Sequence, residues 1–407
     1  MLFSVFENRI SVVTHLNDMN HLSEYKVQGT TLLTVCIVMM YLLATMSPVG
    51  WPRYHKNLDQ PSFLVKSSPE MLHVLYYNQP EWVSGKEFNG CQYPCKMISG
   101  STNFSSAKFV IFHGPRIGFG KPPKKSSGQI WIMHGMESPY HYHADLSKWS
   151  NMFNWTFTYR RDSDVLSLYS GFQHTPLDIT PSVQWKTKDR SSAWMVSNCR
   201  TPGKRDQYVK RLRKSADVHV YGNCGTYRCS HAKESGCMEI LRKHYRYYLA
   251  FENSLCVDYV TEKGFKTYTF SPSTIPVMRG GSNYSLFFPP GSYIDSKDFE
   301  SAFTLGKTIS MNASVMENTK IEQFFSWTKS HSITPNTMDH KIWCDLCERI
   351  HHAESHKRLY SNIKNWLNDN LRPGCKSPSD LRLRTSNPDT GGDAGGRAGV
   401  QEYGAAG

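Results

Sequence analysis

From about residue 190 onward the chain alternates short apolar segments with amphipathic ones, and this alternation constrains the fold more than any other feature. The apolar segments are bounded by turn residues and predict strands over residues 192–197, 217–222, 247–252 and 275–280. The segments between them predict helices over 203–215, from Asp258 onward, and over 296–309. Strands that are separated by helices form parallel β-α-β units, so this region predicts a Rossmann-like domain.

The first half of the chain shows a less regular form of the same pattern. Short apolar segments bounded by Gly, Pro or Asn predict buried strands over residues 73–77, 108–114, 129–135 and 155–160. A chain of 407 residues is long enough for two ordinary domains. We therefore expect an α/β protein with two domains of similar size.

An uncharged segment near the N-terminus predicts a membrane anchor. Residues 27–52 contain no Asp, Glu, Lys, Arg or His, and with their flanks they reach the ~20 residues that span a bilayer. A secretory signal peptide and a buried core helix are the alternatives, but the preceding segment is long and polar and the cleavage site is poor. We expect a tail over 1–26, a transmembrane anchor over 27–50 and a stem over 51–70. The tail over 376–407 is rich in Ser, Pro and Gly and predicts disorder.

Sequons and cysteines indicate that the bulk of the chain is not cytosolic. Four N-x-S/T sequons are candidates for N-glycosylation, at Asn103, Asn154, Asn283 and Asn312. Ten cysteines follow the anchor, an even number that is typical of disulfides. With one N-terminal anchor, these features predict a type II protein of the secretory pathway.

The formal net charge of +13 suits an anionic ligand or a membrane surface. The chain has no run of five consecutive basic residues, which argues against a nucleic-acid partner. Its densest basic cluster, residues 204–214, is equally well explained as a solvated helix face.

Polar side chains follow two of the predicted strands, where parallel sheets bind their ligands. One group is Ser197-Asn198, which precedes a helix that carries Lys204 and Arg205 in its first turn and suits a diphosphate. The other is residues 252–254, followed by a predicted helix that places three side chains on one face: Tyr259, Glu262 and Lys263. An ordinary amphipathic surface helix is the alternative for the second group.

Several long motifs resemble the α1,3-fucosyltransferases of glycosyltransferase family 10. The most specific are "FENSLCVDYVTEK" (251–263) and "GGSNYSLFFPPGSYI" (280–294). Further matching pieces occur in the order of the family: "FVIFHG", "MESP", "FNWTFTYRRDSDV", "MVSN", "VYGNCG" and the late Cys344-x-x-Cys347. The resemblance covers roughly residues 70–370.

The resemblance implies a type II Golgi membrane protein with a lumenal catalytic part of GT-B fold, in which two Rossmann-like domains face a cleft. It implies an acceptor-side domain over 71–188, a GDP-fucose domain over 189–345 and a helical return segment over 346–375. Members move L-fucose from GDP-β-L-fucose to the 3-hydroxyl of GlcNAc in a glycan acceptor, with inversion and without a required cofactor. Whether a divalent cation stimulates the reaction is left open.

The resemblance also implies site residues. Such a displacement needs one base and positive charge near the leaving diphosphate, and the base of the family corresponds to Glu137. The donor contacts correspond to Tyr169, Ser197, Asn198, Arg205, Tyr248, Asn253, Tyr259, Glu262 and Lys263.

Three patterns suggest a metal, but we predict none. Asp162-Ser163-Asp164 resembles a D-x-D metal motif, and His134, His141 and His143 lack a fourth ligand at the usual spacing. The late cysteine pair could be half a zinc site or a redox pair, although a disulfide role is favoured in a lumenal protein. The resemblance implies that Cys344 and Cys347 pair with Cys91 and Cys95, or with each other.

Two segments depart from the family pattern. In residues 264–275, Gly264 and Pro272 weaken the expected helix, and "FHGPRIGFGKPP" (112–123) differs where the acceptor pocket is expected. The acceptor therefore stays open between the core GlcNAc of an N-glycan and a lactosamine antenna. The rival hypotheses are an inactive relative that binds glycans or nucleotide sugar without turnover, and a metal-dependent transferase that uses Asp162 and Asp164.

Overall fold

The structure is a computed structural model that describes residues 69–118, 120–229, 234–310, 318–334, 337–368 and 374–381. All of them belong to one compact unit that begins at Ser67. The predicted tail and anchor, and the stem up to residue 68, lie outside the described residues. Within the described residues, no helix is both long and apolar enough to cross a membrane.

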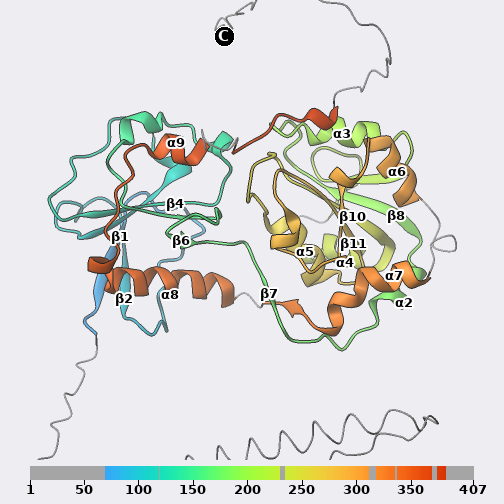
Figure 1. Ribbon diagram of the computed structural model, residues 1–407, viewed down its shortest axis with the longest axis horizontal. Coiled ribbons are helices and arrows are strands. Elements are labelled where there is room, and N and C mark those ends of the chain that lie inside the picture. The colour runs from blue at the N-terminus through green and yellow to red at the C-terminus, as the bar shows by residue number, and fades with distance from the viewer. Residues whose placement is uncertain are drawn as a thin grey trace, which may run out of the picture. The chain divides into compact units, whose positions relative to one another are not determined.

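Two parallel sheets form the framework, and they occupy the two halves of the unit in Figure 1. In order across the first sheet, the strands are β2 (Cys95–Ser99), β1 (Leu72–Tyr76), β3 (Phe109–His113), β4 (Ile130–Gly135), β5 (Trp155–Thr158) and β6 (Val165–Leu166). In order across the second, they are β12 (Ile294–Asp295), β11 (Ile275–Arg279), β10 (Tyr245–Phe251), β8 (Arg190–Met195) and β9 (Val218–Tyr221). The predicted α/β class with parallel sheets is confirmed.

Both faces of the first sheet are buried, and the end of the chain returns to cover them. Helix α8 (Thr337–His351) places Trp343 and Leu346 against one face, whereas α9 (Ile363–Asn368) places Ile363 and Leu367 against the other. Successive strand residues point to opposite faces, which explains why these strands are apolar throughout. Figure 1 shows both return helices beside the first sheet.

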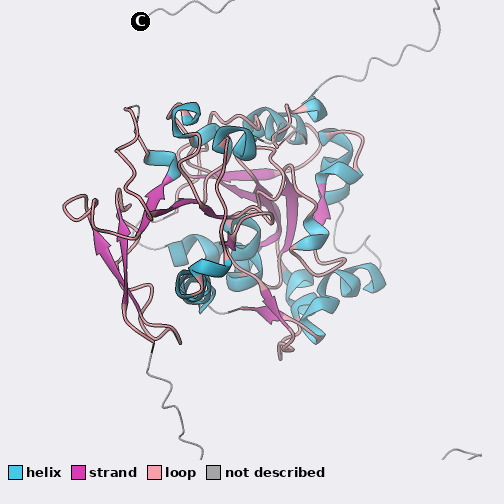
Figure 2. Cartoon of the chain, turned by 60° about the vertical axis from the view of Figure 1, so that its left-hand side comes forward, coloured by secondary structure: helices cyan, strands magenta, loops and turns pink. Residues whose placement is uncertain are grey.

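Helices also cover both faces of the second sheet, as Figure 2 shows. One face packs against α2 (Pro181–Thr187), α3 (Arg205–Leu212), α6 (Ala302–Ser310) and α7 (Asn318–Phe325). The other packs against α4 (Glu234–His244) and α5 (Glu262–Phe270). Trp185 of α2, in the predicted first domain, is buried in the core of the second sheet. The linking segments β7 (Phe172–Gln173) and β13 (Ser332–Ile333) pair antiparallel.

Three expectations from the sequence are wrong in detail. The helix expected from Asp258 begins at Glu262, because Asp258 has a φ of 58°, which helical backbone does not allow. The helix expected over 296–309 begins only at Ala302, after a single 3-10 turn. Residues 376–381 are ordered rather than disordered, because Asp380 pairs with the buried Arg279 at 2.7 Å. The rest of the predicted tail lies outside the described residues.

Helix α5 forms despite Gly264, and the glycine has a packing role there. A Cβ atom at Gly264 would lie 2.7 Å from the ring of Phe288 and 3.0 Å from Met278. The missing side chain therefore lets the helix approach the sheet closely, which offsets its low helix propensity.

All ten cysteines among the described residues form disulfides. The late pair binds the early pair, as Cys91–Cys344 and Cys95–Cys347, which confirms one of the two pairings that the resemblance implied. The other three bonds are Cys199–Cys224, Cys229–Cys237 and Cys256–Cys375. The hypotheses of a zinc site or a redox pair at Cys344 and Cys347 are therefore wrong in this structure.

Candidate active site

A cavity of about 730 Å³ lies where the carboxyl ends of the two sheets meet. Its lining includes Glu137, which follows β4, and Tyr169, which follows β6 in the first half. From the second half, Asn198 follows β8 and Asn253 follows β10. Ligands of parallel α/β sheets bind at this edge, and the volume falls within the ~300–1,000 Å³ that is usual for small-molecule sites.

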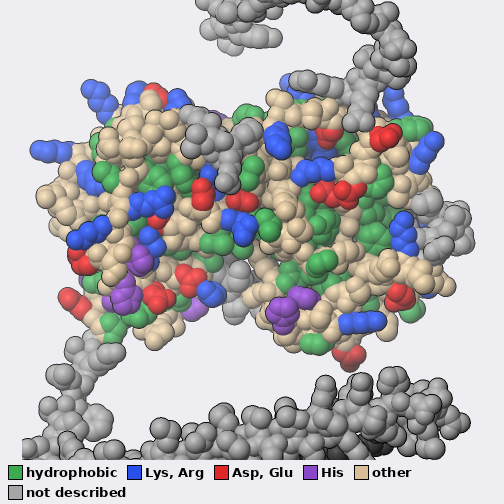
Figure 3. All heavy atoms as spheres, viewed as in Figure 1, with side chains coloured by type: hydrophobic (Ala, Val, Ile, Leu, Met, Phe, Trp, Pro, Cys, Tyr) green, Lys and Arg blue, Asp and Glu red, His purple; other side chains and the backbone are tan. Residues whose placement is uncertain are grey.

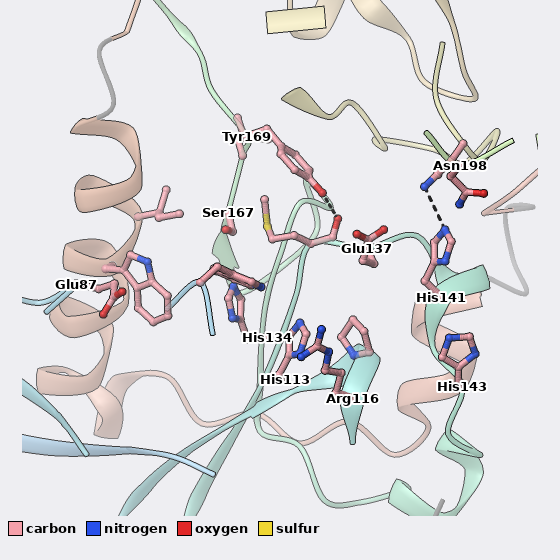
Figure 4. A pocket seen from close by; sticks show the side chains of 17 residues that line it. Glu87, His113, Arg116, His134, Glu137, His141, His143, Ser167, Tyr169 and Asn198 are labelled. Carbon is pink, nitrogen blue, oxygen red and sulfur yellow. Dashed lines mark hydrogen bonds between the residues drawn. The ribbon is translucent and has the colours of Figure 1, made fainter. Parts of the chain in front are cut away.

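Glu137 lies in the middle of the cavity in Figure 4, between two groups of polar side chains. The Tyr259 hydroxyl donates a hydrogen bond to its Oε2 at 3.1 Å. The next residue, Ser138, is buried and bonds the buried Ser254 hydroxyl at 2.8 Å. These contacts join the segment after β4 to the segment after β10, so residues of the second half fix the position of the carboxylate.

Two further contacts join the predicted residues. The Tyr169 hydroxyl donates to the Met136 carbonyl at 2.5 Å, directly beside Glu137. The Asn253 Nδ2 lies 3.1 Å from the His141 Nε2, while the buried Asn253 Oδ1 has no hydrogen-bond partner. Figure 4 shows His141 next to Asn198 on one side of Glu137.

A buried charged cluster lies at the start of α5. Glu252, whose side chain is 2% exposed, accepts hydrogen bonds from the backbone and hydroxyl of Thr261. The Lys263 Nζ lies 3.5 Å from Glu252 and 3.2 Å from Glu262. Burial raises the pKa of Glu252. Burial acts to lower the pKa of Lys263, but the two glutamates outweigh it and raise that pKa, so the lysine is charged at neutral pH.

Arg205 is buried and bonds two strand ends rather than pointing into the cavity. Its guanidinium donates to the Phe251 carbonyl at 2.8 Å and the Asn198 carbonyl at 3.2 Å. Burial lowers its pKa, and its Nε has no hydrogen-bond partner. The guanidinium thus holds the segments after β8 and β10 together.

The structure does not bring every predicted residue to the cavity. Of the predicted base and donor contacts, four line it: Glu137, Tyr169, Asn198 and Asn253. Tyr259 touches it only through Glu137, Tyr248 is buried in the core on the α4 and α5 face, and Ser197 is exposed outside the lining. Lys263 and Glu262 form the separate cluster on α5, so their donor roles stay predictions.

Sequence reasoning missed part of the lining, which comes from the loop after β1 and from the return helix α8. Trp82 and Glu87 come from the loop between β1 and β2, and Trp343 comes from α8. No local motif marks these residues, because the loop reaches the cavity only through its tertiary contacts.

The Asp residues of the D-x-D pattern are held by other side chains. Asp164 accepts hydrogen bonds from Arg349 and Arg358 at 3.1 Å, and from the Tyr360 hydroxyl at 2.8 Å. Asp162 pairs with Arg160 at 2.7 Å. Neither lines the cavity, so this arrangement gives no support to the metal-dependent hypothesis.

The three histidines of the other metal pattern line the cavity but do not converge. The buried His134 bonds the Tyr76 hydroxyl at 2.6 Å, His141 contacts Asn253, and His143 is exposed. Among the described residues, the groups that could hold a metal are both disulfide-bonded pairs with a nearby histidine, His340 or His351.

The sequons differ in their surroundings. Asn103 and Asn283 are exposed. The Asn154 Nδ2, the atom that a glycan would take, donates to the Arg358 carbonyl at 3.0 Å, and its Oδ1 accepts from Lys125. Asn312 lies outside the described residues. Asn103 and Asn283 are therefore the more accessible candidates.

The described residues form no large surface of one charge sign on the face that Figure 3 shows. Lys and Arg side chains are scattered there, with Asp and Glu between them. The excess positive charge is thus spread over this face rather than gathered in a stripe of the kind that tracks nucleic acid.

The fold and the cavity define an α/β protein with a ligand site between two parallel sheets. Two models of one family match it: the fucosyltransferase N-terminal model over residues 69–170, and the glycosyltransferase family 10 (fucosyltransferase) C-terminal model over 185–366. Together they cover more than half of the chain. The chain belongs to glycosyltransferase family 10, the fucosyltransferase family.

Curated relatives carry the same name. The chain is 34% identical over 284 residues to alpha-(1,3)-fucosyltransferase C of Drosophila melanogaster, covering 64% of each chain. It is 30% identical to glycoprotein 3-alpha-L-fucosyltransferase A of the same organism, over 74% of this chain and 61% of that one. It is 29% identical to human alpha-(1,3)-fucosyltransferase 7, over 67% of this chain and 78% of that one. The chain thus spans a little under two thirds of the first two relatives.

A solved structure also resembles the chain. The lipopolysaccharide outer core galactosyltransferase WaaB, in its apo form, gives a TM-score of 0.40 at 10% identity, over 69% of this chain and 100% of that one. This likeness is too low to carry an argument.

Proposed function

We propose that the protein is an inverting α1,3-fucosyltransferase that moves L-fucose from GDP-β-L-fucose to the 3-hydroxyl of GlcNAc in a glycan. The observation that carries the proposal is the position of Glu137, in a cavity lined by both halves, in a chain of the fucosyltransferase family. The two parallel sheets with their helices, and the cavity between them, suit a GT-B fold.

In the proposed reaction Glu137 is the general base. Its carboxylate removes the proton of the acceptor 3-hydroxyl, the freed oxygen attacks C1 of fucose, and the bond from C1 to the GDP oxygen breaks with its electron pair. One displacement of this kind inverts the anomeric centre. The Tyr259 hydroxyl donates to Oε2 of Glu137, and Oε1 is proposed to take the proton of the acceptor hydroxyl.

The donor side is proposed to lie along the carboxyl edge of the second sheet. Asn198 and Asn253 line the cavity there, and Lys263, at the start of α5, lies 3.5 Å from Glu252, the residue that precedes Asn253. A lysine near a helix N-terminus favours the negative charge that develops on a leaving diphosphate. No step in this proposal requires a metal, since the cations of the chain can supply the positive charge.

Replacement of the proposed base tests the function. We expect Glu137→Gln to lower turnover by ~10²-fold or more, the usual scale for a general base, with unchanged affinity for GDP-fucose. Gln keeps the shape and the oxygen that accepts from Tyr259, so folding should be preserved. Initial rates and calorimetry of GDP-fucose binding make the measurement, with the exposed Glu81→Gln as the control.

Near-normal turnover of Glu137→Gln would remove Glu137 from this role. Binding of GDP-fucose by the wild type without any transfer, to GlcNAc, lactosamine or an N-glycan core, would instead favour an inactive relative. Full activity in the presence of a chelator would argue against a metal-dependent transferase.

We also propose that the folded part lies in the Golgi lumen behind a type II anchor. Five disulfides among the described residues support an oxidising compartment. Protease protection in intact Golgi vesicles tests the orientation, and cleavage of the folded part without detergent would contradict it.

A further inference from the structure

One arm of the cavity has no part in the chemistry proposed above. It is formed by Trp82, Glu87, His113 and Ser167, which we call the Trp82 arm, and all four come from the first half of the chain. In Figure 4, Glu87, His113 and Ser167 lie on the side of Glu137 that is opposite to Asn198 and His141.

The Trp82 arm gathers polar atoms that have no partner. The buried Glu87 Oε2, His113 Nδ1 and Ser167 Oγ form no hydrogen bond in the structure. His113 and Ser167 are themselves 6% and 1% exposed. Buried polar groups are nearly always hydrogen-bonded, so several unpaired ones lining the same cavity indicate a ligand with hydroxyl or amide groups.

Glu87 is held in place for such a role. Its Oε1 accepts hydrogen bonds from the backbone and the hydroxyl of Ser84, at 2.5 and 2.9 Å. The carboxylate is thereby fixed through one oxygen, while the unpaired oxygen lines the cavity. A fixed carboxylate oxygen is a strong acceptor for a ligand hydroxyl.

Trp82 supplies an apolar surface beside these atoms. Its side chain is 59% exposed, and its ring lies edge-on to His113 at 5.9 Å and to His134 at 5.6 Å between centroids. Burial lowers the pKa values of His113 and His134 to about 4 and about 3, so both rings are neutral at pH 7. An exposed aromatic ring rimmed by polar groups marks a binding surface.

The loop that carries Trp82 and Glu87 is fastened to α8. The disulfide Cys91–Cys344 and a hydrogen bond of 2.6 Å between the His340 ring and the Asn89 carbonyl connect the two. The arm is thus built in advance, and its ligand need not order a free loop.

We propose that the Trp82 arm binds the sugar that is linked to the reacting GlcNAc, and that Trp82 and Glu87 determine acceptor specificity. The apolar face of the second pyranose packs on the Trp82 ring, and one of its hydroxyls donates to the Glu87 Oε2. This inference rests on the proposed function, because it places the reacting GlcNAc at Glu137.

Acceptor kinetics with short and extended sugars test the arm. The acceptors are free GlcNAc and two disaccharides, Galβ1,4GlcNAc and GlcNAcβ1,4GlcNAc. We expect Trp82→Ala and Glu87→Gln to raise KM for at least one disaccharide by ~10-fold, or about 1.4 kcal/mol. KM for free GlcNAc, and the Kd of GDP-fucose, should stay within twofold of wild type.

Two controls match these variants on described residues outside the lining: Glu81→Gln on the same loop, and Phe303→Ala, an exposed aromatic on α6. Both should behave as wild type. Equal losses for free GlcNAc and for both disaccharides, or no loss at all, would overturn the inference.

Direct binding separates this inference from the proposed function. Saturation-transfer NMR of each disaccharide with the GDP-bound protein needs no turnover. If the wild type transfers no fucose, the proposed function fails, but weaker disaccharide binding by Trp82→Ala still supports a sugar subsite. Unchanged disaccharide binding by both Trp82→Ala and Glu87→Gln contradicts the subsite whatever the activity.

Discussion

Two carboxylates, one in each half of the molecule, are buried to the same degree but are held in different ways. The side chains of Asp164 and Glu252 are each 2% exposed. Asp164 bonds Arg349 and Arg358 from the return segment through one oxygen, and Tyr360 through the other. Glu252 bonds Thr261, nine residues further along, and faces Lys263 at 3.5 Å.

The two carboxylates differ in whether the cations that they hold remain available to an anionic ligand. Both oxygens of Asp164 are engaged by groups of the chain, including backbone of β5 through Thr156 at 2.9 Å, so this carboxylate fastens the return segment to the first sheet. Lys263 remains 23% exposed and is shared between two glutamates, so its charge is partly available to an anion. A buried carboxylate is structural in the first case and part of an adjustable charged cluster in the second.

The largest expected effect is on folding. Asp164→Asn leaves Arg349 facing a neutral side chain inside the protein, and breaking a buried pair in this way costs ~3–5 kcal/mol. We expect the free energy of unfolding to fall by about that amount in denaturant titrations, while the folded fraction keeps its turnover per molecule and its response to chelator.

Asp162→Asn is the matched control, since the Asp162 side chain is 54% exposed and pairs with Arg160. A pair in which one partner is open to solvent contributes ~0–1 kcal/mol, so the loss of stability should be smaller than for Asp164→Asn. A metal requirement that disappears in either variant would restore the D-x-D hypothesis and remove the structural role of Asp164.

The second expected effect is on catalysis, and it concerns Lys263, which pairs with Glu252. Lys263→Ala removes the charge that is proposed to stabilise the leaving diphosphate, a contribution that grows in the transition state. We expect turnover at saturating GDP-fucose to fall by ~10²-fold or more, with a smaller loss of GDP-fucose affinity by calorimetry. The exposed Lys210→Ala on α3 is the control for a general loss of positive charge.

If Lys263→Ala loses only affinity and keeps its saturated turnover, the lysine is a ground-state anchor. If neither affinity nor turnover changes, the cluster on α5 is structural, and the contrast between Asp164 and Glu252 disappears.

The comparison also shows what the sequence could predict. Eight strands of the two sheets coincide with predicted segments, because these segments are apolar and bounded by turn residues. The other three, β2, β6 and β12, were not predicted, since β2 mixes polar and apolar residues and the other two have 2 residues each. The polar residues after β8 and β10 were predictable because parallel strands end at a common edge. Asp164 was recognisable only as part of a D-x-D pattern, since its partners lie about 190 residues further along the chain.

Other features depend on tertiary contacts that leave no local pattern. The helix boundary at Glu262 follows from Asp258, which has positive φ and accepts a hydrogen bond from the Arg161 backbone. The nearby Cys256 is bonded to Cys375, 119 residues further along the chain, and no local pattern indicates this pairing. Trp82 and Glu87 reach the cavity from a loop without regular structure, so no periodicity could identify them.

The smallest expected effect is on the pH dependence of stability, and it arises from Glu252. Burial raises the folded-state pKa of Glu252 above its ordinary value of 4.5. Below that value the side chain is protonated in both folded and unfolded chains and resembles Gln. As the pH rises, the unfolded chain releases its proton first, so the folded state of the wild type loses stability relative to the unfolded state. This loss is complete once the pH exceeds the folded pKa. Glu252→Gln carries no such cost.

We therefore expect the free energy of unfolding of Glu252→Gln, taken relative to that of the wild type, to rise between pH 4 and pH 7. This rise is expected whatever the difference between the two proteins at pH 4. Parallel denaturant titrations of both proteins at several pH values measure this difference directly. A difference that is constant with pH, or one that falls, would show that Lys263 and Thr261 stabilise the charged carboxylate enough to cancel its burial. Glu252 would then be a satisfied ion-pair partner like Asp164, and its cluster would have no spare charge for a ligand.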